Sequence, residues 1–359
     1  MLGSNYYTIY LILITLMSLY QCYKYYNVSY GVLENRPKER LVPSFFLMLS
    51  LAIFIGLRPD WSGFADSRNY IRTIESYRGN VFIFDSECEN LLFDNLIQWF
   101  GCSGLSWTGF FILIASIYFG GQLIAVRKML PRDTLFAYLI VLAAFSTFSY
   151  ATNGIKAGAA ASIFLVAIAY REKRVISALL LAISYGFHHS MQVLIVAFVI
   201  VSLIKNPKIY LLLWLFSFIV AALGITTFQY FFAGFTDEQG AGYLMADGLD
   251  AYITGFRLDF IIYSAMPVLL GSYLIYKKRI QQSRLNFILN IYILANSVWM
   301  LCMYASFTNR IAYLSWQLLP IVLVYPFFST QFSTLQYKQI SYIALAHLSF
   351  TLFMNIIYY

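Results

Sequence analysis

The chain has 359 residues, of which 60% are apolar, 19% aromatic and 11% charged, and its formal net charge is +8. About a quarter of the residues in a soluble domain are charged, so this composition excludes an ordinary soluble protein. It indicates a protein that lies in a membrane over its whole length, with no separate soluble domain.

Apolar runs recur along the sequence, and we interpret each as a helix that crosses roughly 30 Å of hydrocarbon at about 1.5 Å per residue. Helices are expected because lipid offers no partner to an unpaired backbone group. The first run lacks a basic start and a cleavage site, so we expect a retained span and not a signal peptide. The twelve predicted spans cover residues 6–26, 42–57, 105–126, 135–151, 155–170, 175–187, 190–204, 209–225, 258–276, 285–305, 311–328 and 339–357.

The predicted fold class is therefore all-α, a polytopic integral membrane protein with about twelve transmembrane helices. Residues 1–359 form a single transmembrane domain in this prediction. Its two larger outer loops are residues 58–104 and residues 226–257.

Basic residues favour one orientation. Alternation of the twelve spans places seventeen of the 24 Lys and Arg residues on the same side as the first loop. Cytoplasmic loops carry an excess of Lys and Arg, so this side is expected to face the cytoplasm. The clusters are Lys24 with Arg36, Lys38 and Arg40; Arg127 with Lys128 and Arg132; Arg171 with Lys173 and Arg174; Lys205 with Lys208; Lys277 with Lys278, Arg279 and Arg284; and Lys338.

Residues 175–204 can be divided in two ways, as one long span or as two short ones. A single span would place Lys277 and Lys278 outside, against the charge bias, so two spans are favoured. The first of them, from Val175 to Phe187, covers only about 20 Å. Its outer end should stop short of the membrane surface, which would place His188 and His189 in a recess.

The first outer loop is expected to contain two short helices. One carries Arg68, Arg72 and Glu75 on one face, because these residues are separated by four and three positions. The other is predicted to begin at a capping box formed by Ser86 and Glu89. Its apolar side, which could lie in the membrane interface, consists of Leu91, Leu92, Leu96, Ile97, Trp99 and Phe100. The second outer loop has no clear period and is interpreted as a mobile lid or binding loop.

Seven basic residues remain on the outer side, against the bias: Arg58, Arg68, Arg72, Arg78, Lys156, Arg257 and Arg310. Four of them are placed at the outer ends of spans, together with His188 and His189; the four are Arg58, Lys156, Arg257 and Arg310. Cations gathered at one depth indicate a bound anion, such as the phosphate or pyrophosphate of a lipid-linked sugar. The alternative is that each snorkels to lipid phosphates or pairs with an outer acidic residue.

Four short motifs then appear in order, and they are Arg58 followed by Gly63, Asp66 and Tyr70; Asn153-Gly154-Ile155-Lys156; Phe187-His188-His189-Ser190; and Asn309-Arg310-Ile311-Ala312-Tyr313. Their order and spacing resemble those of the EpsG-like family, Wzy-type polymerases of bacterial O-antigen, capsule and exopolysaccharide. The chain departs from the family where Asn-x-x-Arg-Gln is usual, because it has Lys156-Ala157 there. A bidentate guanidinium contact would then become a point-charge contact.

The resemblance implies a GT-C-like glycosyltransferase in the bacterial inner membrane, with its active site facing the periplasm. It would transfer a growing glycan from undecaprenyl pyrophosphate to the sugar end of another lipid-linked repeat unit. The implied partners are this lipid-linked oligosaccharide, membrane lipid and a possible chain-length regulator protein, without nucleic acid. No cofactor and no metal are implied.

The residue types suit this chemistry, because glycosyl transfer needs a base for the acceptor hydroxyl and positive charge at the departing pyrophosphate. His188 is the candidate base, Asp66 would orient it or an arginine, and Arg310 completes the catalytic set. His189 is a neighbour whose role stays open. The candidate ligands of pyrophosphate and glycan are Arg58, Arg68, Lys156, Arg257, Arg310 and His189, with Tyr70, Tyr243, Tyr252 and Tyr313 as stacking faces for sugars.

The acidic run from Asp85 to Glu89 offers oxygen atoms to a hard cation, but acids at a helix start are expected for dipole reasons alone. Cys88 and Cys102 share the first outer loop, where either a disulfide or two free thiols would be compatible with the compartment.

Three other functions stay open. A flippase or exporter of the same glycan would need cations and aromatic residues too, but transporters usually place ionisable groups near the bilayer midplane, and most predicted spans have none there. A glycosyltransferase or ligase with another acceptor would use an acidic base, for which Asp237 and Glu238 are candidates. A purely structural subunit would not need so charged a first outer loop.

Overall fold

The computed structural model describes residue 3, residues 5–26, residue 28, residues 37–233, residue 242, residues 255–306 and residues 308–358. Within these ranges the regular secondary structure is helical and no strand occurs. The chain divides into two compact units, of which unit 1 comprises Met1–His188 with Phe327–Tyr359 and unit 2 comprises His189–Pro326.

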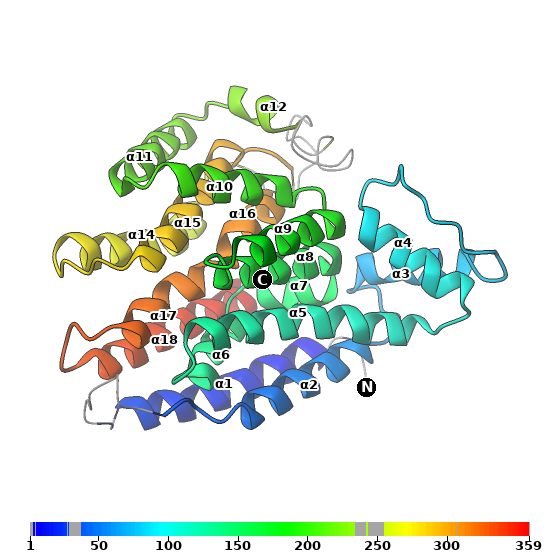
Figure 1. The fold of residues 1–359 in the computed structure, drawn as a ribbon, viewed down its shortest axis with the longest axis horizontal. Coiled ribbons are helices and arrows are strands. Elements are labelled where there is room, and N and C mark those ends of the chain that lie inside the picture. The colour runs from blue at the N-terminus through cyan, green and yellow to red at the C-terminus, as the bar shows by residue number, and fades with distance from the viewer. Residues whose placement is uncertain are drawn as a thin grey trace. The chain divides into compact units, whose positions relative to one another are not determined.

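Unit 1 is built around a long central helix, α5, which lies between α2 and α8 (Figure 1). The C-terminal helix α18 packs against α1. The helices of unit 1 are α1 (Asn5–Tyr26), α2 (Val42–Gly56), α3 (Ala65–Ser76), α4 (Leu91–Cys102), α5 (Trp107–Met129), α6 (Thr134–Leu142), α7 (Thr147–Thr152), α8 (Ile155–Ala169), α9 (Arg174–Phe187) and α18 (Gln336–Phe353), which ends in a π-helical turn (Met354–Tyr358).

Unit 2 contains α10 (Met191–Leu203), α11 (Pro207–Ala222), α12 (Thr227–Ala233), α14 (Leu258–Tyr276), α15 (Ser283–Leu301), α16 (Thr308–Trp316) and α17 (Leu319–Ser329), the last of which continues into unit 1 from Phe327. Its interior is organised by Trp316, whose indole Nε1 donates a hydrogen bond of 2.8 Å to Ser264 Oγ. Asn296 on α15 connects α11 with α16, since it accepts from Trp214 Nε1 at 2.9 Å and donates to Ser315 Oγ at 3.1 Å.

The prediction of an all-α chain is confirmed over the described residues. Four helical segments are long and apolar enough to cross a membrane, and they are Trp107–Met129, Leu258–Tyr276, Thr308–Ser329 and Gln336–Ile356. Five shorter apolar helices accompany them, namely α2, α8, α9, α10 and α11. These helices are those expected of a membrane protein, and the number of twelve spans stays a prediction.

Several boundaries differ from the sequence expectation. The run 135–151 is two helices, α6 and α7, because the chain turns between them and the Thr147 hydroxyl donates to the Val141 carbonyl at 2.9 Å. The run 311–328 is interrupted between α16 and α17, where Pro320 supplies no amide proton to continue the helix. The division of residues 175–204 into two helices is confirmed, because α9 ends at Phe187 and His188 is extended.

The capping box predicted at Ser86 and Glu89 is wrong. Helix α4 begins at Leu91 with Asn90 as its N-cap. The amide of Asn90 donates to Asp94 Oδ2 at 2.9 Å, so this pair satisfies a terminal amide that the Ser86–Glu89 pair was expected to satisfy. The predicted apolar side of α4 is only partly buried. Ile97 and Phe100 are buried, whereas Leu91, Leu92 and Trp99 are exposed.

Small residues bring α5 and α8 close together. A Cβ atom on Gly121 would lie 2.7 Å from Ser162 Oγ, and the Ser162 hydroxyl lies 3.1 Å from the Ile117 carbonyl oxygen. Such close backbone approach is how helices associate in lipid, where apolar side chains gain little by leaving the solvent. It holds the middle of α8 against the central helix.

Candidate functional site

Arg58 follows α2, at the position predicted as the outer end of a span, and is only 1% exposed. Its Nε donates to Ser67 Oγ at 2.9 Å, its Nη1 donates to the Ile55 carbonyl at 3.0 Å, and its guanidinium lies 3.8 Å from the centre of the Phe111 ring. Burial lowers the pKa of Arg58 to about 9, which leaves the side chain charged at neutral pH. Its Nη2 is buried and has no hydrogen-bond partner among the residues that the structure describes.

Ser67 connects Arg58 to the second motif. While its Oγ accepts from Arg58, its hydroxyl donates to the Thr152 carbonyl at 2.7 Å, at the end of α7. The next residue, Asn153, donates from Nδ2 to the Gly63 carbonyl at 3.4 Å. The first two motifs are therefore joined by hydrogen bonds. Sequence reasoning assigned no role to Ser67, and nothing in the sequence distinguishes it from the other serines.

Lys156 is the second residue of α8 and is half-buried. Helix α8 begins immediately after α7, and Gly158 makes the tight turn possible, since a Cβ there would lie 2.7 Å from the Tyr150 carbonyl oxygen. A cation at a helix N-terminus opposes the helix dipole, and a bound anion would offset that repulsion.

The third motif reaches the first through aromatic side chains. The Tyr70 ring packs edge-on against Phe93 at 5.4 Å, and Phe93 packs edge-on against Phe187 at 6.4 Å. Helix α9 approaches α4 closely, because a Cβ on Gly186 would lie 2.7 Å from Leu92 Cγ. His188 follows Phe187 and is half-buried. The first two motifs and the Phe187-His188 part of the third are thus connected within unit 1.

Two other charged residues of α3, Arg68 and Glu75, form ion pairs. Asp66 lies in the first turn of the helix and is half-buried. Arg68 Nε pairs with Asp60 Oδ1 at 2.8 Å on the surface. Glu75 pairs with Arg78, with 2.9 Å between Nη2 and Oε1, and this hydrogen bond holds the pKa of Glu75 below its usual value.

The remaining site residues belong to unit 2. His189 Nε2 lies 3.1 Å from Gln192 Nε2, so in its neutral form this ring nitrogen can accept from the amide. Arg257, at the start of α14, makes a two-bonded pair with Asp259, with distances of 3.0 Å from Nε to Oδ1 and 2.6 Å from Nη2 to Oδ2. Its charge is therefore already matched by a carboxylate.

Arg310 and Tyr313 both lie on α16. Arg310 is exposed in the first turn, whereas Tyr313 is buried at 7% exposure with its ring 5.7 Å from Trp316. Trp316 also contacts Phe260 at 4.9 Å, and the Arg257 guanidinium lies 4.2 Å from that Phe260 ring. Arg257 and Tyr313 are thereby connected through two aromatic rings.

Several predicted features fall outside the described residues. They are Tyr243, Tyr252, the pair Asp237 and Glu238, and most of the loop 226–257. Within the described ranges no three His, Cys, Asp or Glu side chains form a group that could hold a metal ion. Cys88 and Cys102 are both free thiols, as are Cys22 and Cys302.

Comparison with known proteins gives one match. The model of the EpsG family matches residues 41–359, which contain all four motifs. No curated protein and no solved structure matches the chain.

Proposed function

Because the chain belongs to the EpsG family, we propose that it is a polysaccharide repeat-unit polymerase of the bacterial inner membrane. The reaction is transfer of a growing glycan from undecaprenyl pyrophosphate to the sugar end of another lipid-linked repeat unit on the periplasmic face. The partners are this lipid-linked oligosaccharide and surrounding lipid, with chain length set by a separate regulator protein.

The observation that carries the proposal is the buried guanidinium of Arg58. No carboxylate within ion-pair distance of it is found among the described residues, although a buried charge is costly unless it is paired. A charge retained at that cost is explained if an anion approaches it during function. Pyrophosphate is such an anion, and Arg recognises it through paired N–H donors.

The neighbouring residues divide the remaining chemistry. Lys156 stands at the start of α8, one turn beyond the hydrogen bonds that join the first two motifs, and adds a second positive charge for the departing pyrophosphate. His188 is the base that accepts the proton of the acceptor hydroxyl. Tyr70 offers a ring face to a sugar, and Asp66 orients a neighbouring basic group. Arg310, His189 and Tyr313, which belong to unit 2, are further candidate ligands of the glycan and its pyrophosphate.

The proposed reaction needs no metal. Positive charge at the leaving group is the task that a divalent cation performs in many phosphate-transferring enzymes, and here Arg58 and Lys156 would perform it, with Arg310 of unit 2 as a further candidate. Arg68 would contribute less, because Asp60 already pairs with it at 2.8 Å. Arg257 contributes less, because Asp259 already matches its charge.

Complementation of a polymerase-deficient strain of the source bacterium tests the function. The wild-type chain should restore a ladder of long surface polysaccharide on a gel, and His188→Ala should reduce it to single repeat units at equal protein level. His189→Ala is the matched comparison for the base. Arg78→Gln is the control for charge removal, because this surface arginine pairs with Glu75 outside the motifs. If the wild-type chain restored no polymer and lipid-linked units accumulated inside the cell, a flippase would replace the polymerase as the explanation.

A further inference from the structure

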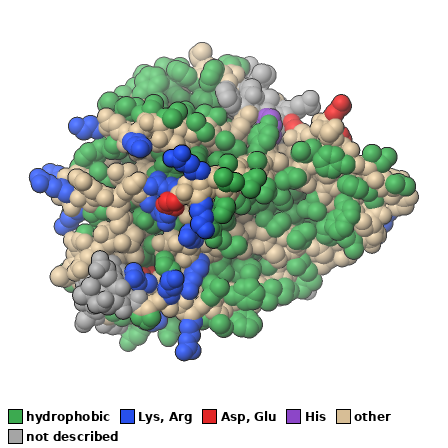
Figure 2. All heavy atoms as spheres, in the orientation of Figure 1, with side chains coloured by type: hydrophobic (Ala, Val, Ile, Leu, Met, Phe, Trp, Pro, Cys, Tyr) green, Lys and Arg blue, Asp and Glu red, His purple; other side chains and the backbone are tan. Residues whose placement is uncertain are grey.

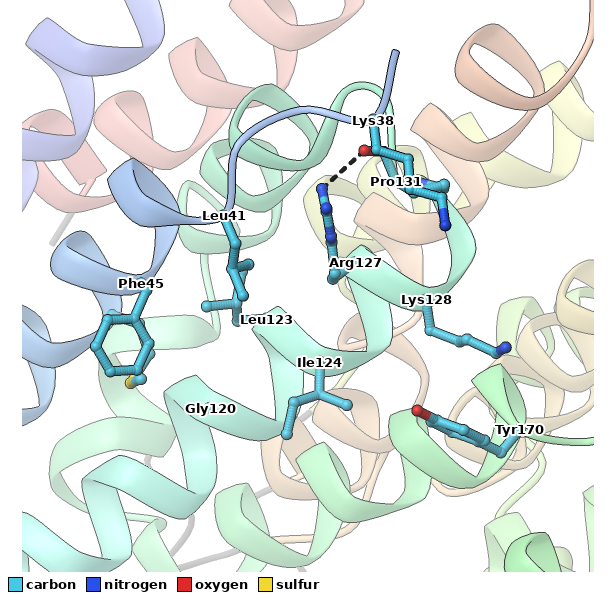
Figure 3. A pocket seen from close by; sticks show the side chains of 11 residues that line it. Lys38, Leu41, Phe45, Gly120, Leu123, Ile124, Arg127, Lys128, Pro131 and Tyr170 are labelled. Carbon is cyan, nitrogen blue, oxygen red and sulfur yellow. Dashed lines mark hydrogen bonds between the residues drawn. The ribbon is translucent and has the colours of Figure 1, made fainter. Parts of the chain in front are cut away.

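Unit 1 contains a cavity between the start of α2 and the C-terminal part of α5, away from Arg58 (Figure 3). Arg58 follows the C-terminus of α2, whereas the cavity is lined by residues at its N-terminal half, beginning with Leu41. Its volume of about 460 Å³ is in the range of small-molecule and lipid sites. Figure 2 shows a band of Lys and Arg side chains on the face in view, in the region of the C-terminal end of α5.

One wall of the cavity is apolar. Leu41, Phe45 and Met48 lie at positions i, i+4 and i+7 at the start of α2, and α5 contributes Leu123 and Ile124. Phe45 is 45% exposed and Ile124 is 50% exposed, so part of this wall is open to its surroundings. Gly120 lies on the same face of α5, and a Cβ added there would meet no atom within 4 Å. The cavity therefore continues over the bare backbone of α5.

The rim of the cavity is basic. Lys38 and Lys128 are both exposed, and Lys128 Nζ lies 5.1 Å from the centre of the Tyr170 ring, toward which it points in Figure 3. Among the described residues neither amine has a carboxylate within ion-pair distance. The nearest acid in the sequence, Glu39, uses its Oε2 to accept from the Leu135 amide at 2.9 Å.

Arg127 holds this rim in place, and the two lysines take no part in these hydrogen bonds. Its Nη1 donates to the carbonyl oxygens of Glu39 at 2.7 Å and Pro131 at 2.8 Å, which ties the segment before α2 to the turn after α5. The rim is thus a preformed frame on which Lys38 and Lys128 present their charges.

We propose that this cavity binds one anionic phospholipid, with an acyl chain along the apolar wall and the phosphate between Lys38 and Lys128. An apolar wall next to an unmatched positive rim fits a molecule that is itself apolar at one end and anionic at the other. Basic pockets between membrane helices recognise acidic head groups in this way. A free phosphate ion would leave the apolar wall unused. This site is separate from the proposed polymerase site and does not depend on it.

Native mass spectrometry of the purified full-length protein tests the proposal. After removal of co-purified lipid, the protein is titrated with phosphatidylglycerol or, in parallel, with phosphatidylcholine of the same acyl chains. Two lysines at a membrane surface predict a preference of roughly 30-fold for the anionic lipid. Gly120→Phe fills the cavity, Gly120→Ala is its matched control, and a paired Lys38→Gln and Lys128→Gln variant removes the charge. A paired Lys277→Gln and Lys278→Gln variant removes two exposed lysines of another loop.

The expected result is loss of phosphatidylglycerol binding in Gly120→Phe, retention in Gly120→Ala, and loss of the preference in the Lys38 and Lys128 variant alone. The lysine changes are at the surface and leave the helices intact, so they keep the test decisive if Gly120→Phe fails to fold. The proposal is overturned if Gly120→Phe binds like wild type, if both lipids bind equally to wild type, or if inorganic phosphate displaces the lipid.

Discussion

The Arg58 Nε donates a hydrogen bond of 2.9 Å to Ser67 Oγ, and this bond joins the end of α2 to the first turn of α3. Because the Ser67 hydroxyl donates onward to Thr152, the bond also fixes the buried cation relative to α7 and the start of α8. Neither neighbour is a carboxylate. The folded chain thus keeps a charge in its interior with polar, uncharged partners, which costs stability and orients the guanidinium.

Arg58→Met is expected to separate stability from function. The methionine replaces the buried charge by an apolar side chain of similar length. The two groups that accept from Arg58 keep another partner. The Ile55 carbonyl is still approached by the backbone amide of residue 58 at 3.3 Å, and the Ser67 hydroxyl still donates to Thr152. We expect an unchanged or higher Tm, measured in detergent, together with loss of the polymer ladder. Arg58→Lys keeps the charge without the two-pronged donor and should retain partial activity. A full ladder from Arg58→Met would remove Arg58 from the site.

Ser67→Ala should be more destabilising in the presence of Arg58 than in its absence. The change removes the acceptor of a charged donor in the interior, which costs about 1.5–3 kcal/mol. In the Arg58→Met background that donor is gone, so the same serine change should cost markedly less. The measurement is a double-mutant cycle on the free energy of unfolding, and equal costs in the two backgrounds would show that the two side chains are not coupled.

Gly158→Ala is predicted to loosen the start of α8. Its new methyl group would meet the Tyr150 carbonyl oxygen at 2.7 Å, and such overpacking costs typically 1–3 kcal/mol. Gly120→Ala is the matched control, because it makes the same chemical change in a helix where the methyl meets nothing within 4 Å. That variant should gain roughly 0.5–1 kcal/mol from helix propensity. The two Tm values, compared with wild type, should therefore move in opposite directions.

Helix positions were largely predictable because they depend on the length and continuity of apolar runs, which the sequence displays directly. Even the division between α9 and α10 was predicted from the charge of the distant residues Lys277 and Lys278. The start of α4 was not, since Ser86 with Glu89 and Asn90 with Asp94 both have capping chemistry and only the packed loop selects between them.

The candidate site was predictable by residue type and much less by environment. The motifs identified Arg58 and Asn153, but they gave no indication that Ser67 bridges Arg58 to the Thr152 backbone or that Arg58 is buried. Such contacts depend on how helices far apart in sequence pack against each other. Arg257 illustrates the converse, because its pairing with Asp259 two residues away is local and agrees with the alternative interpretation, in which an outer cation pairs with an outer acidic residue.

Lys156→Arg and Lys156→Gln test whether the second motif supplies charge. Under the proposed function, Gln keeps the length and polarity of the side chain but removes the positive charge at the leaving group, so polymerisation should fall by roughly 100-fold. Arg keeps the positive charge and adds a second donor for a bidentate contact, so this variant should equal or exceed wild type. The readout is the rate of ladder formation in membranes, with Arg78→Gln as the control for loss of a surface cation. A Lys156→Gln rate equal to that of wild type would assign Lys156 to lipid snorkelling instead.

The proposed orientation can be measured with the four native cysteines. Cys88 and Cys102 are both partly exposed and belong to the predicted first outer loop, whereas Cys22 is 4% and Cys302 0% exposed. A membrane-impermeant maleimide added from the periplasmic side should label Cys88 and Cys102 and spare the two buried thiols. Cys88→Ser and Cys102→Ser variants assign the signals.

The pH dependence of Cys88 labelling tests the environment of this thiol, because the thiolate is the form that reacts. Partial burial, and then the charges of Asp94 and Asp85, raise the pKa of the Cys88 thiol. A raised pKa leaves less thiolate at neutral pH, so labelling of Cys88 should be slow at pH 7 and accelerate as the pH rises to 9. Replacing Asp94 by Asn should increase the rate at pH 7. If labelling of both cysteines required permeabilised membranes, the loop would lie on the cytoplasmic side, and the orientation together with a periplasmic active site would be wrong.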